Sequence, residues 1–225
     1  MPPDRDLRYK RAMSWQKDDA PGSRRSYHHG NLREALIEAA LVLISQKGPA
    51  GFTFAEAARA AGVSPAAPYR HFRDRDALMA DVARRGYEAF AAALAKAWDG
   101  GKPAPRAAFE RLGRAYLDFA RREPALYAAM FESGLSAHDH PQLREAGDKA
   151  FGVLREACEA LAATHPGPQR PPALMMALHV WSLSHGIAAL FARGDSARRP
   201  IPMSPEDLLE AAVLVYLEGL GVPRG

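Results

Sequence analysis

The chain has 225 residues, of which 48% are hydrophobic and 25% are charged, a composition typical of soluble globular proteins. Its single cysteine, Cys158, excludes an internal disulfide framework and fits a reducing compartment. The formal net charge is +4, yet residues 1–86 hold 15 Lys and Arg against 10 Asp and Glu, an excess of +5 that leaves −1 for the remainder. This asymmetry favours a polyanion-binding N-terminal part on a nearly neutral body.

The composition predicts an all-α fold. Apolar residues are mostly Ala, Leu, Val and Met, alternating β-branched runs are missing, and Gly and Pro fall where helical patterns end. Residues 1–26 have no apolar core of the signal-peptide type, so we expect a flexible basic arm and a cytoplasmic protein. About nine helices are predicted, over residues 31–47, 53–61, 64–72, 75–98, 105–122, 124–133, 141–164, 172–193 and 204–220.

Several of these boundaries carry local signals. Thr53 followed by Glu56 forms a capping-box pattern, and Gly62 ends the short helix that it opens. Ser64-Pro65 predicts a second N-cap, with Pro at the first helical position. Asp74 is predicted to cap the long fourth helix, and Ser204 the last one. Two short helices joined by a Gly-containing turn predict a helix-turn-helix at 53–72.

The residues of this segment resemble a known family. Phe-Thr-Phe-Ala-Glu-Ala-Ala-Arg-Ala-Ala-Gly-Val-Ser-Pro-Ala-Ala-Pro-Tyr-Arg-His-Phe at 52–72, followed by Asp-Arg-Asp-Ala-Leu at 74–78, is similar to the DNA-binding signature of the TetR family. The match runs from about Tyr27 to Tyr87. It implies a DNA-binding domain at 27–73 and a ligand-binding and dimerisation domain at 74–225.

The resemblance also implies roles for single residues. Phosphate contacts fall to Thr53, Tyr69, His71 and Arg75, whose side chains all carry donors. Base edges in the major groove would meet the start of the third helix, at Ser64, Pro65, Ala66 and Ala67. The preceding arm, with Arg25, Tyr27 and His28, could run along the duplex.

The start of the predicted recognition helix departs from the usual pattern. Many relatives have polar residues there, whereas this chain has Pro65, Ala66, Ala67 and Pro68. We therefore expect specificity to depend on methyl contacts to thymine, on Arg70 or Arg59, and on DNA shape. Pro68 removes a helical hydrogen bond and disfavours α geometry before it, so a distorted helix start is expected.

The C-terminal body is predicted to dimerise and to bind a ligand. The segment 172–193 is apolar around nearly its whole circumference, and 204–220 is amphipathic. The family resemblance implies that these two helices form a homodimer interface. Trp181 to Gly186 also resembles a Trp-x-x-x-His-Gly signature of one branch of TetR-like C-terminal domains. Candidate pocket residues are Tyr116, Tyr127, Met130, Phe131, Met175, Trp181 and His185, although core packing is an alternative for each.

Other functional classes fit less well. The apolar stretch at 173–192 is long enough to span a bilayer, but it carries polar residues at its centre, so no membrane association is expected. Ser184 and His185 are adjacent on one helix and point about 100° apart, which disfavours a hydrolase. No catalytic residue, metal or cofactor is predicted, since His28 and His29 alone are too few ligands. A helical adaptor that binds only protein remains a remote alternative.

The sequence therefore predicts a DNA-binding transcriptional regulator. We expect a dimeric repressor that binds a palindromic operator in double-stranded DNA and is released by a small, mostly apolar effector. An activator or a ligand-independent regulator is the alternative. The sequence does not identify the effector.

Overall fold

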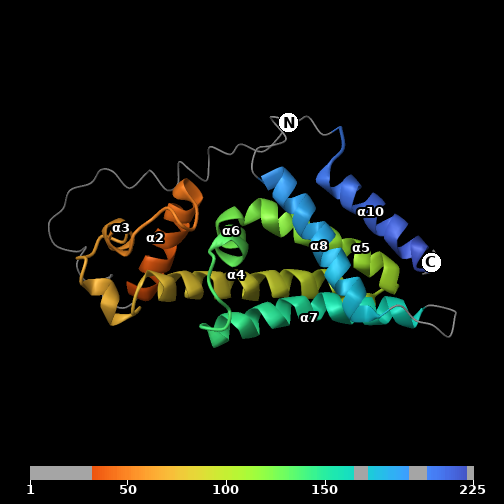
Figure 1. The fold of residues 1–225 in the computed structure, drawn as a ribbon, viewed down its shortest axis with the longest axis horizontal. Coiled ribbons are helices and arrows are strands. Elements are labelled where there is room, and N and C mark those ends of the chain that lie inside the picture. Colours follow the sequence, from red (N-terminus) through yellow and green to blue (C-terminus); the bar gives the residue numbers. More distant parts are fainter. Residues whose placement is uncertain (1–31, 165–171, 193–201, 222–225) are drawn as a thin grey trace. The chain divides into compact units, whose positions relative to one another are not determined.

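A computed structural model of the chain describes residues 32–164, 172–192 and 202–221. Two compact units, Met1–Leu32 and Arg33–Gly225, are distinguished, and the second holds every described residue except Leu32. All regular structure in the described ranges is helical, which confirms the predicted all-α class (Figure 1). The α-helices are α2 (Leu32–Lys47), α3 (Phe54–Ala60), α4 (Arg75–Trp98), α5 (Pro105–Arg122), α6 (Pro124–Glu132), α7 (Pro141–Ala163), α8 (Ala173–Ala192) and α10 (Pro205–Gly219), with 3₁₀ helices η1 (Ala67–Arg70) and η2 (Asp99–Gly101).

The predicted helix starts are formed by side-chain caps. The Thr53 hydroxyl accepts from the amide of Glu56, and the Glu56 carboxylate accepts from the amide of Thr53, which completes the capping box. The Asp74 side chain caps α4 by accepting from the amide of Ala77, and the Ser204 hydroxyl caps α10 by accepting from the amide of Asp207. Gly62 has a φ of +72°, a conformation that other residues rarely adopt, and it turns the chain away from α3. Asn31, the predicted cap of the first helix, lies outside the described residues.

The predicted recognition helix is not an α-helix. Its span of 64–72 contains a turn at Pro65-Ala66 and only the four-residue 3₁₀ helix η1. Pro68 lies inside η1, has no amide hydrogen to donate, and its own side chain is buried. The expectation of a regular helix capped by Ser64 is therefore wrong, whereas the expected distortion by Pro68 is confirmed. Within the described ranges there are eight α-helices rather than nine.

The head, residues 33–73, has a small core of its own. Its buried side chains include those of Leu36, Ala40, Leu43, Ala57, Ala58 and Phe72. Phe52, Ile37 and Ile44 complete this core, and Phe54 is only half-buried. A core of this size leaves stability to be supplied by contacts with α4.

Those contacts with α4 are ionic at their centre. The Asp81 carboxylate on α4, only 4% exposed, lies 3.1 Å from Arg33 of α2 and 2.8 Å from Arg84. Arg85 lies 3.6 Å from the same carboxylate and donates both terminal nitrogens to Glu34 of α2. Burial by itself would raise the pKa of Asp81, but hydrogen bonds from Arg33 and Arg84 outweigh it and lower that pKa. The Asp81 cluster, comprising Asp81, Arg33, Arg84, Arg85 and Glu34, therefore joins α2 to α4.

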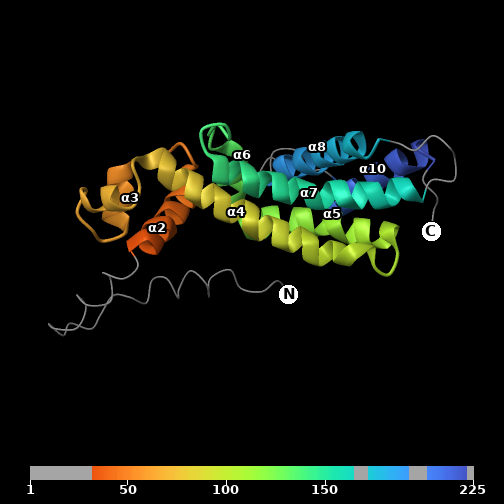
Figure 2. The ribbon, with the colours of Figure 1, turned by 90° about the horizontal axis from the view of Figure 1, so that it is seen from below.

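The body packs around the second half of α4. Helices α4 and α7 run side by side (Figure 2), and α5, α6 and α8 close the core over them. Gly86 is the point of closest approach between α4 and α6, since a Cβ there would lie 2.8 Å from the Met130 sulfur. A residue other than glycine would displace the Met130 side chain and crowd the Leu126 carbonyl at 3.3 Å.

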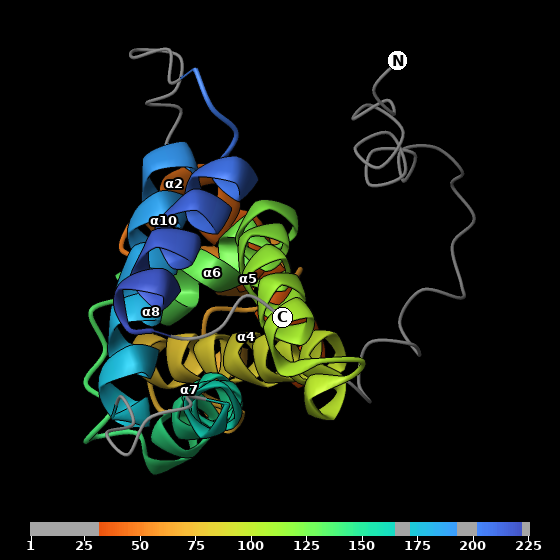
Figure 3. The same cartoon turned by 90° about the vertical axis from the view of Figure 1, so that its right-hand side faces the viewer.

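Helix α8 is uncovered on one side. Residues Ala173–Phe191 are long and apolar enough to cross a membrane, but α8 packs on α5, α7 and α10 within this body (Figure 3). Its outer face leaves Leu174, Leu178 and Leu190 exposed, and α10 adds Leu214 and Val215. A row of exposed large apolar side chains on two adjacent helices marks an interaction surface.

Replacing Asp81 by Asn should lower the free energy of unfolding by about 1–3 kcal/mol, because three arginines would lose their buried counter-charge. The folded pKa of Asp81 is lowered, so its contribution is complete above the unfolded value of about 4 and is lost as the pH falls through the folded value. Urea unfolding should show the gap between wild type and Asp81→Asn narrowing below pH 4. The control Glu88→Gln, at an exposed partner of Arg84, should change stability by under about 0.5 kcal/mol.

Candidate functional sites

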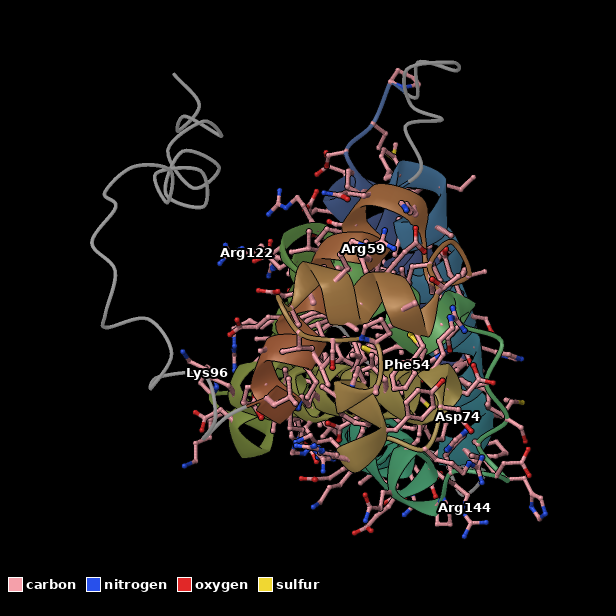
Figure 4. The ribbon with its side chains drawn as sticks, turned by 90° about the vertical axis from the view of Figure 1, so that its left-hand side faces the viewer. Phe54, Arg59, Asp74, Lys96, Arg122 and Arg144 are labelled. Atoms are coloured by element: carbon pink, nitrogen blue, oxygen red, sulfur yellow. The ribbon has the colours of Figure 1, made fainter. Side chains whose placement is uncertain are left out.

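One edge of the head carries the exposed residues of the helix-turn-helix. Figure 4 views this end of the unit, with Phe54 and Arg59 on α3. The side chains exposed along the edge are those of Thr53, Arg59, Ser64, Pro65, Ala66, Tyr69, Arg70 and His71, while Ala67 is half-buried. The structure therefore brings together the predicted residues at 53 and at 64–71 on one accessible surface. Arg25, Tyr27 and His28 lie outside the described residues.

Tyr69 is held in place although it is 62% exposed. Its ring contacts the Phe54 ring edge-to-face, with the centroids 5.0 Å apart. Such a contact restricts the phenol while its hydroxyl stays accessible. Together with the buried Pro68 that precedes Tyr69, this pair of rings fixes the surface of η1 on α3.

The start of α3 is electrostatically fixed as well. Lys47 of α2 lies 2.7 Å from the Glu56 carboxylate that closes the capping box. This hydrogen bond from Lys47, followed by those from Thr53, lowers the pKa of Glu56 to about 2. Glu56 is therefore ionised at any physiological pH, and it holds Thr53 and the first turn of α3 toward Lys47.

Arg75 is engaged inside the protein rather than presented to solvent. Its Nε donates to the Phe52 carbonyl at 2.9 Å, its Nη2 donates to the Pro49 carbonyl, and its guanidinium lies over the Phe52 ring at 4.9 Å. Its Nη1 pairs with Asp76 at 3.0 Å. The guanidinium thus ties the 48–53 loop to the first turn of α4. Three of the five N–H donors of the Arg75 guanidinium therefore have protein partners.

A second set of predicted residues meets in the body. Tyr116, Tyr127 and Met130 are buried, and Phe131, Trp181 and His185 are half-buried. The five rings contact one another at centroid distances of 4.7–6.3 Å, and Met130 belongs to the same core. We call these six residues the aromatic cluster. Met175 is not part of it, because its side chain lies on the exposed face of α8.

The aromatic cluster contains a short hydrogen-bond chain. The Tyr127 hydroxyl lies 2.8 Å from Nδ1 of His185, and the Tyr116 hydroxyl lies 3.3 Å from both groups. Desolvation lowers the pKa of His185, which favours the neutral imidazole. Burial raises the pKa of Tyr127 to about 12, so both tyrosines stay protonated donors. The cluster joins α5, α6 and α8 through polar contacts inside an apolar core.

Two features of the structure have no signal in the sequence. The Asp81 cluster pairs residues 48 and 51 positions apart, a separation for which the sequence has no periodic signal. The second is a cavity between α5, α8 and α10, into which Ser184 faces. Cys158 is buried as predicted, and burial raises the pKa of its thiol to about 12. Among the described side chains, no three or more His, Cys, Asp or Glu residues are grouped as a metal site requires.

A helix-turn-helix head on an all-helical body defines a DNA-binding regulator. Two family models match the chain: bacterial regulatory proteins of the tetR family at residues 36–82, and the tetracyclin repressor-like C-terminal domain at 109–216. The chain belongs to the TetR family of transcriptional regulators. This is a family of DNA-binding regulators rather than enzymes. No curated protein matches the chain significantly.

Solved structures show the same fold. A protein of unknown function from Rhodococcus sp. RHA1 is 34% identical, with a TM-score of 0.72 over 88% of this chain and 99% of that one. The TetR family transcriptional regulator PfmR from Thermus thermophilus is 21% identical, with a TM-score of 0.64 over 84% and 99%. NemR from E. coli, in its reduced form, is 20% identical, with a TM-score of 0.62 over 86% and 100%. The latter two likenesses concern the fold alone.

Replacing Arg75 by Lys should lower the free energy of unfolding by about 1–2 kcal/mol. A single ammonium group cannot reach the Pro49 and Phe52 carbonyls together, so one buried acceptor loses its charged donor. Denaturant unfolding of Arg73→Lys provides the matched control, because the Arg73 side chain is 85% exposed and should change stability by under about 0.5 kcal/mol. Equal stability of Arg75→Lys and wild type would refute the assigned role.

Proposed function

We propose that this chain is a cytoplasmic, homodimeric transcriptional repressor that binds a palindromic operator and is released by a small, mostly apolar effector. The observation that carries the proposal is the single exposed edge of the head, where Thr53, Tyr69 and His71 lie with the surface of η1. Donors at such an edge suit phosphate oxygens, and the accessible methyl groups of Ala66 and Ala67 suit a base edge. We further propose a DNA-binding domain at 27–73 and an effector-binding and dimerisation domain at 74–225.

Direct hydrogen bonding to bases falls to few residues in this proposal. Pro65, Ala66 and Ala67 offer no side-chain donor, and η1 is too short to fill a groove as a regular recognition helix does. Arg59 and Arg70 are the exposed cations that flank this surface. We therefore assign base readout to Arg59 and to thymine contacts, and a phosphate contact to Arg70, with Arg75 as a positioning residue for Thr53 and α3.

The second copy is proposed to cover the exposed row on α8 and α10. This dimer surface comprises Leu174, Leu178, Leu190, Leu214 and Val215. In the middle of α8, Gly186 is exposed and has no atom within 4 Å of a Cβ built on it. A glycine in a helix interior costs about 1 kcal/mol of stability, and here it would allow a helix of the second copy to approach closely. Two copies joined here present two heads, which is what a palindromic operator requires.

Release by an effector requires that the body influence the head. Helix α6 carries Tyr127 of the aromatic cluster and meets α4 at Gly86, one residue from Arg85 of the Asp81 cluster. Tyr87 strengthens this contact, because its hydroxyl donates to the Met130 carbonyl at 3.2 Å. A displacement of α6 would thus move α4 where it holds α2, and an effector that prefers the displaced state lowers DNA affinity.

The DNA contacts can be tested by the salt dependence of binding to the chain's own promoter region. Arg70→Gln should reduce the magnitude of the log K against log [salt] slope by about 1.8, because a dimer loses two cations at the duplex. Arg75→Gln should weaken binding yet leave the slope unchanged, because this arginine is engaged by protein carbonyls. A smaller slope for Arg75→Gln would return it to the phosphate-contact role, and salt-independent binding by wild type would refute the DNA-binding proposal.

The dimer surface can be tested by sedimentation. Leu178→Glu places two charges in the proposed interface and should convert a dimer to a monomer at micromolar concentration. Val42→Glu is the control, since Val42 is equally exposed on α2 but far outside the proposed interface, and it should remain dimeric. A monomeric wild type, or a dimeric Leu178→Glu, would contradict the assignment.

A further inference from the structure

The cavity between α5, α8 and α10 has the properties of a small-molecule site. It has a volume of about 70 Å³, and Figure 3 shows the three helices that enclose it. Its apolar wall is formed by Leu112, Leu117, Val180, Leu209, Val213 and Leu217. One polar group lies deep in it, the Ser184 hydroxyl, whose residue is 3% exposed. Apolar cavities with few polar groups bind small hydrocarbon ligands rather than water.

This cavity is separate from the aromatic cluster. Ser184 and His185 are neighbours on α8 and point about 100° apart, so Ser184 faces α5 and α10 while His185 bonds to Tyr127 of α6. The aromatic cluster is filled by its own rings at contact distance, whereas the space at Ser184 is not filled by side chains. The two sites lie on different sides of α8.

The charges at the rim of the cavity disfavour an anionic ligand. Arg106 and Arg114 face Glu110, Glu206 and Glu210 there, so the two cations are outnumbered by three carboxylates. Arg114 already lies 3.9 Å from both Glu110 and Glu210. No surplus positive charge remains to attract a carboxylate or phosphate. The apolar wall disfavours a charge of either sign, because an ion buried against it would lose its hydration without a partner. The ligand that fits is therefore uncharged, largely hydrocarbon, and carries one hydrogen-bonding group for Ser184.

The volume limits the ligand further. A cavity of about 150 Å³ holds benzene, so a cavity of about 70 Å³ suits a ligand of roughly half that size, about three or four heavy atoms. A longer ligand would need α10 to shift. Helix α10 is attached to α5 by exposed ion pairs at 3.8 and 3.9 Å, which stabilise little, and by the apolar side chains that line the cavity. Helix α10 is therefore the helix that would shift to admit a longer ligand.

We propose that the cavity under α10 is a binding site for small, uncharged aliphatic alcohols or ketones, anchored at Ser184. This inference rests on the proposed function in one respect, because it names the place where an effector binds. Leu214 and Val215 of the dimer surface lie on α10 itself. A ligand that moves α10 alters that surface, and with it the distance between two heads.

Two probes test the site on the full-length protein: xenon, which is apolar, and 1-propanol, which adds a hydroxyl. Crystals pressurised with xenon should show it between Val213 and Ser184, and ligand-observed NMR should show millimolar binding of 1-propanol. Ser184→Ala should leave xenon binding unchanged and weaken 1-propanol about tenfold, because one hydrogen bond is lost. Xenon absent from the cavity of wild type would overturn the site, and unchanged 1-propanol affinity in Ser184→Ala would overturn the anchor.

A matched pair of variants separates the cavity from the helix surface. Val213→Phe fills the cavity and should abolish binding of both probes, whereas Ala211→Phe, on the exposed face of the same helix and outside the proposed dimer surface, should bind both as wild type does. Equal loss in the two variants, or none in Val213→Phe, contradicts the site. These readouts do not involve DNA, so a failure of operator binding would reject the proposed function without rejecting the cavity.

Discussion

The buried carboxylate of Asp81 sets the relation between the head and the body. It is nearly inaccessible, and it can stay ionised there only because Arg33, Arg84 and Arg85 surround it. Arg33 belongs to α2 and the other two to α4, so the carboxylate is satisfied only when α2 is docked. An ion cluster has directional requirements that an apolar contact lacks. The small head thereby gains a defined orientation on α4 that its own limited core could not provide.

Helix α4 is in consequence shared by two cores. Its first half holds the head through the Asp81 cluster and through Arg75, and its second half is buried among α5, α6, α7 and α8. The close approach at Gly86 makes α6 sensitive to any change in α4, and the reverse. Because α4 is continuous, a change in its distance from α6 at Gly86 also affects the part of α4 that holds the head. The proposed release of DNA by an effector depends on this link between α6, α4 and the head.

Local signals made much of the fold predictable. Thr53, Asp74 and Ser204 cap their helices through contacts within three residues, so the sequence contains both partners. The 3₁₀ helix η1 was not predicted because the burial of Pro68 depends on packing against distant residues. The family resemblance implied a phosphate contact for Arg75 but not its hydrogen bonds to the Pro49 and Phe52 carbonyls, because these acceptors lie 26 and 23 positions away in the sequence. All the candidate pocket residues except Met175 lie in the aromatic cluster. The position of Met175 could not be predicted, because a helix with apolar residues on every side does not reveal which side faces inward. The cavity at Ser184 arises from three helices and has no counterpart in sequence spacing.

The central claim is that two heads of this fold, joined by α8 and α10, read DNA together. Its most direct test is to sequence the genomic DNA fragments that the full-length protein retains at physiological salt. We expect an inverted repeat whose half-site centres lie about one helical turn, 10–10.5 base pairs, or a multiple of it apart. Retained fragments without an inverted repeat, or with a single half-site, would contradict it.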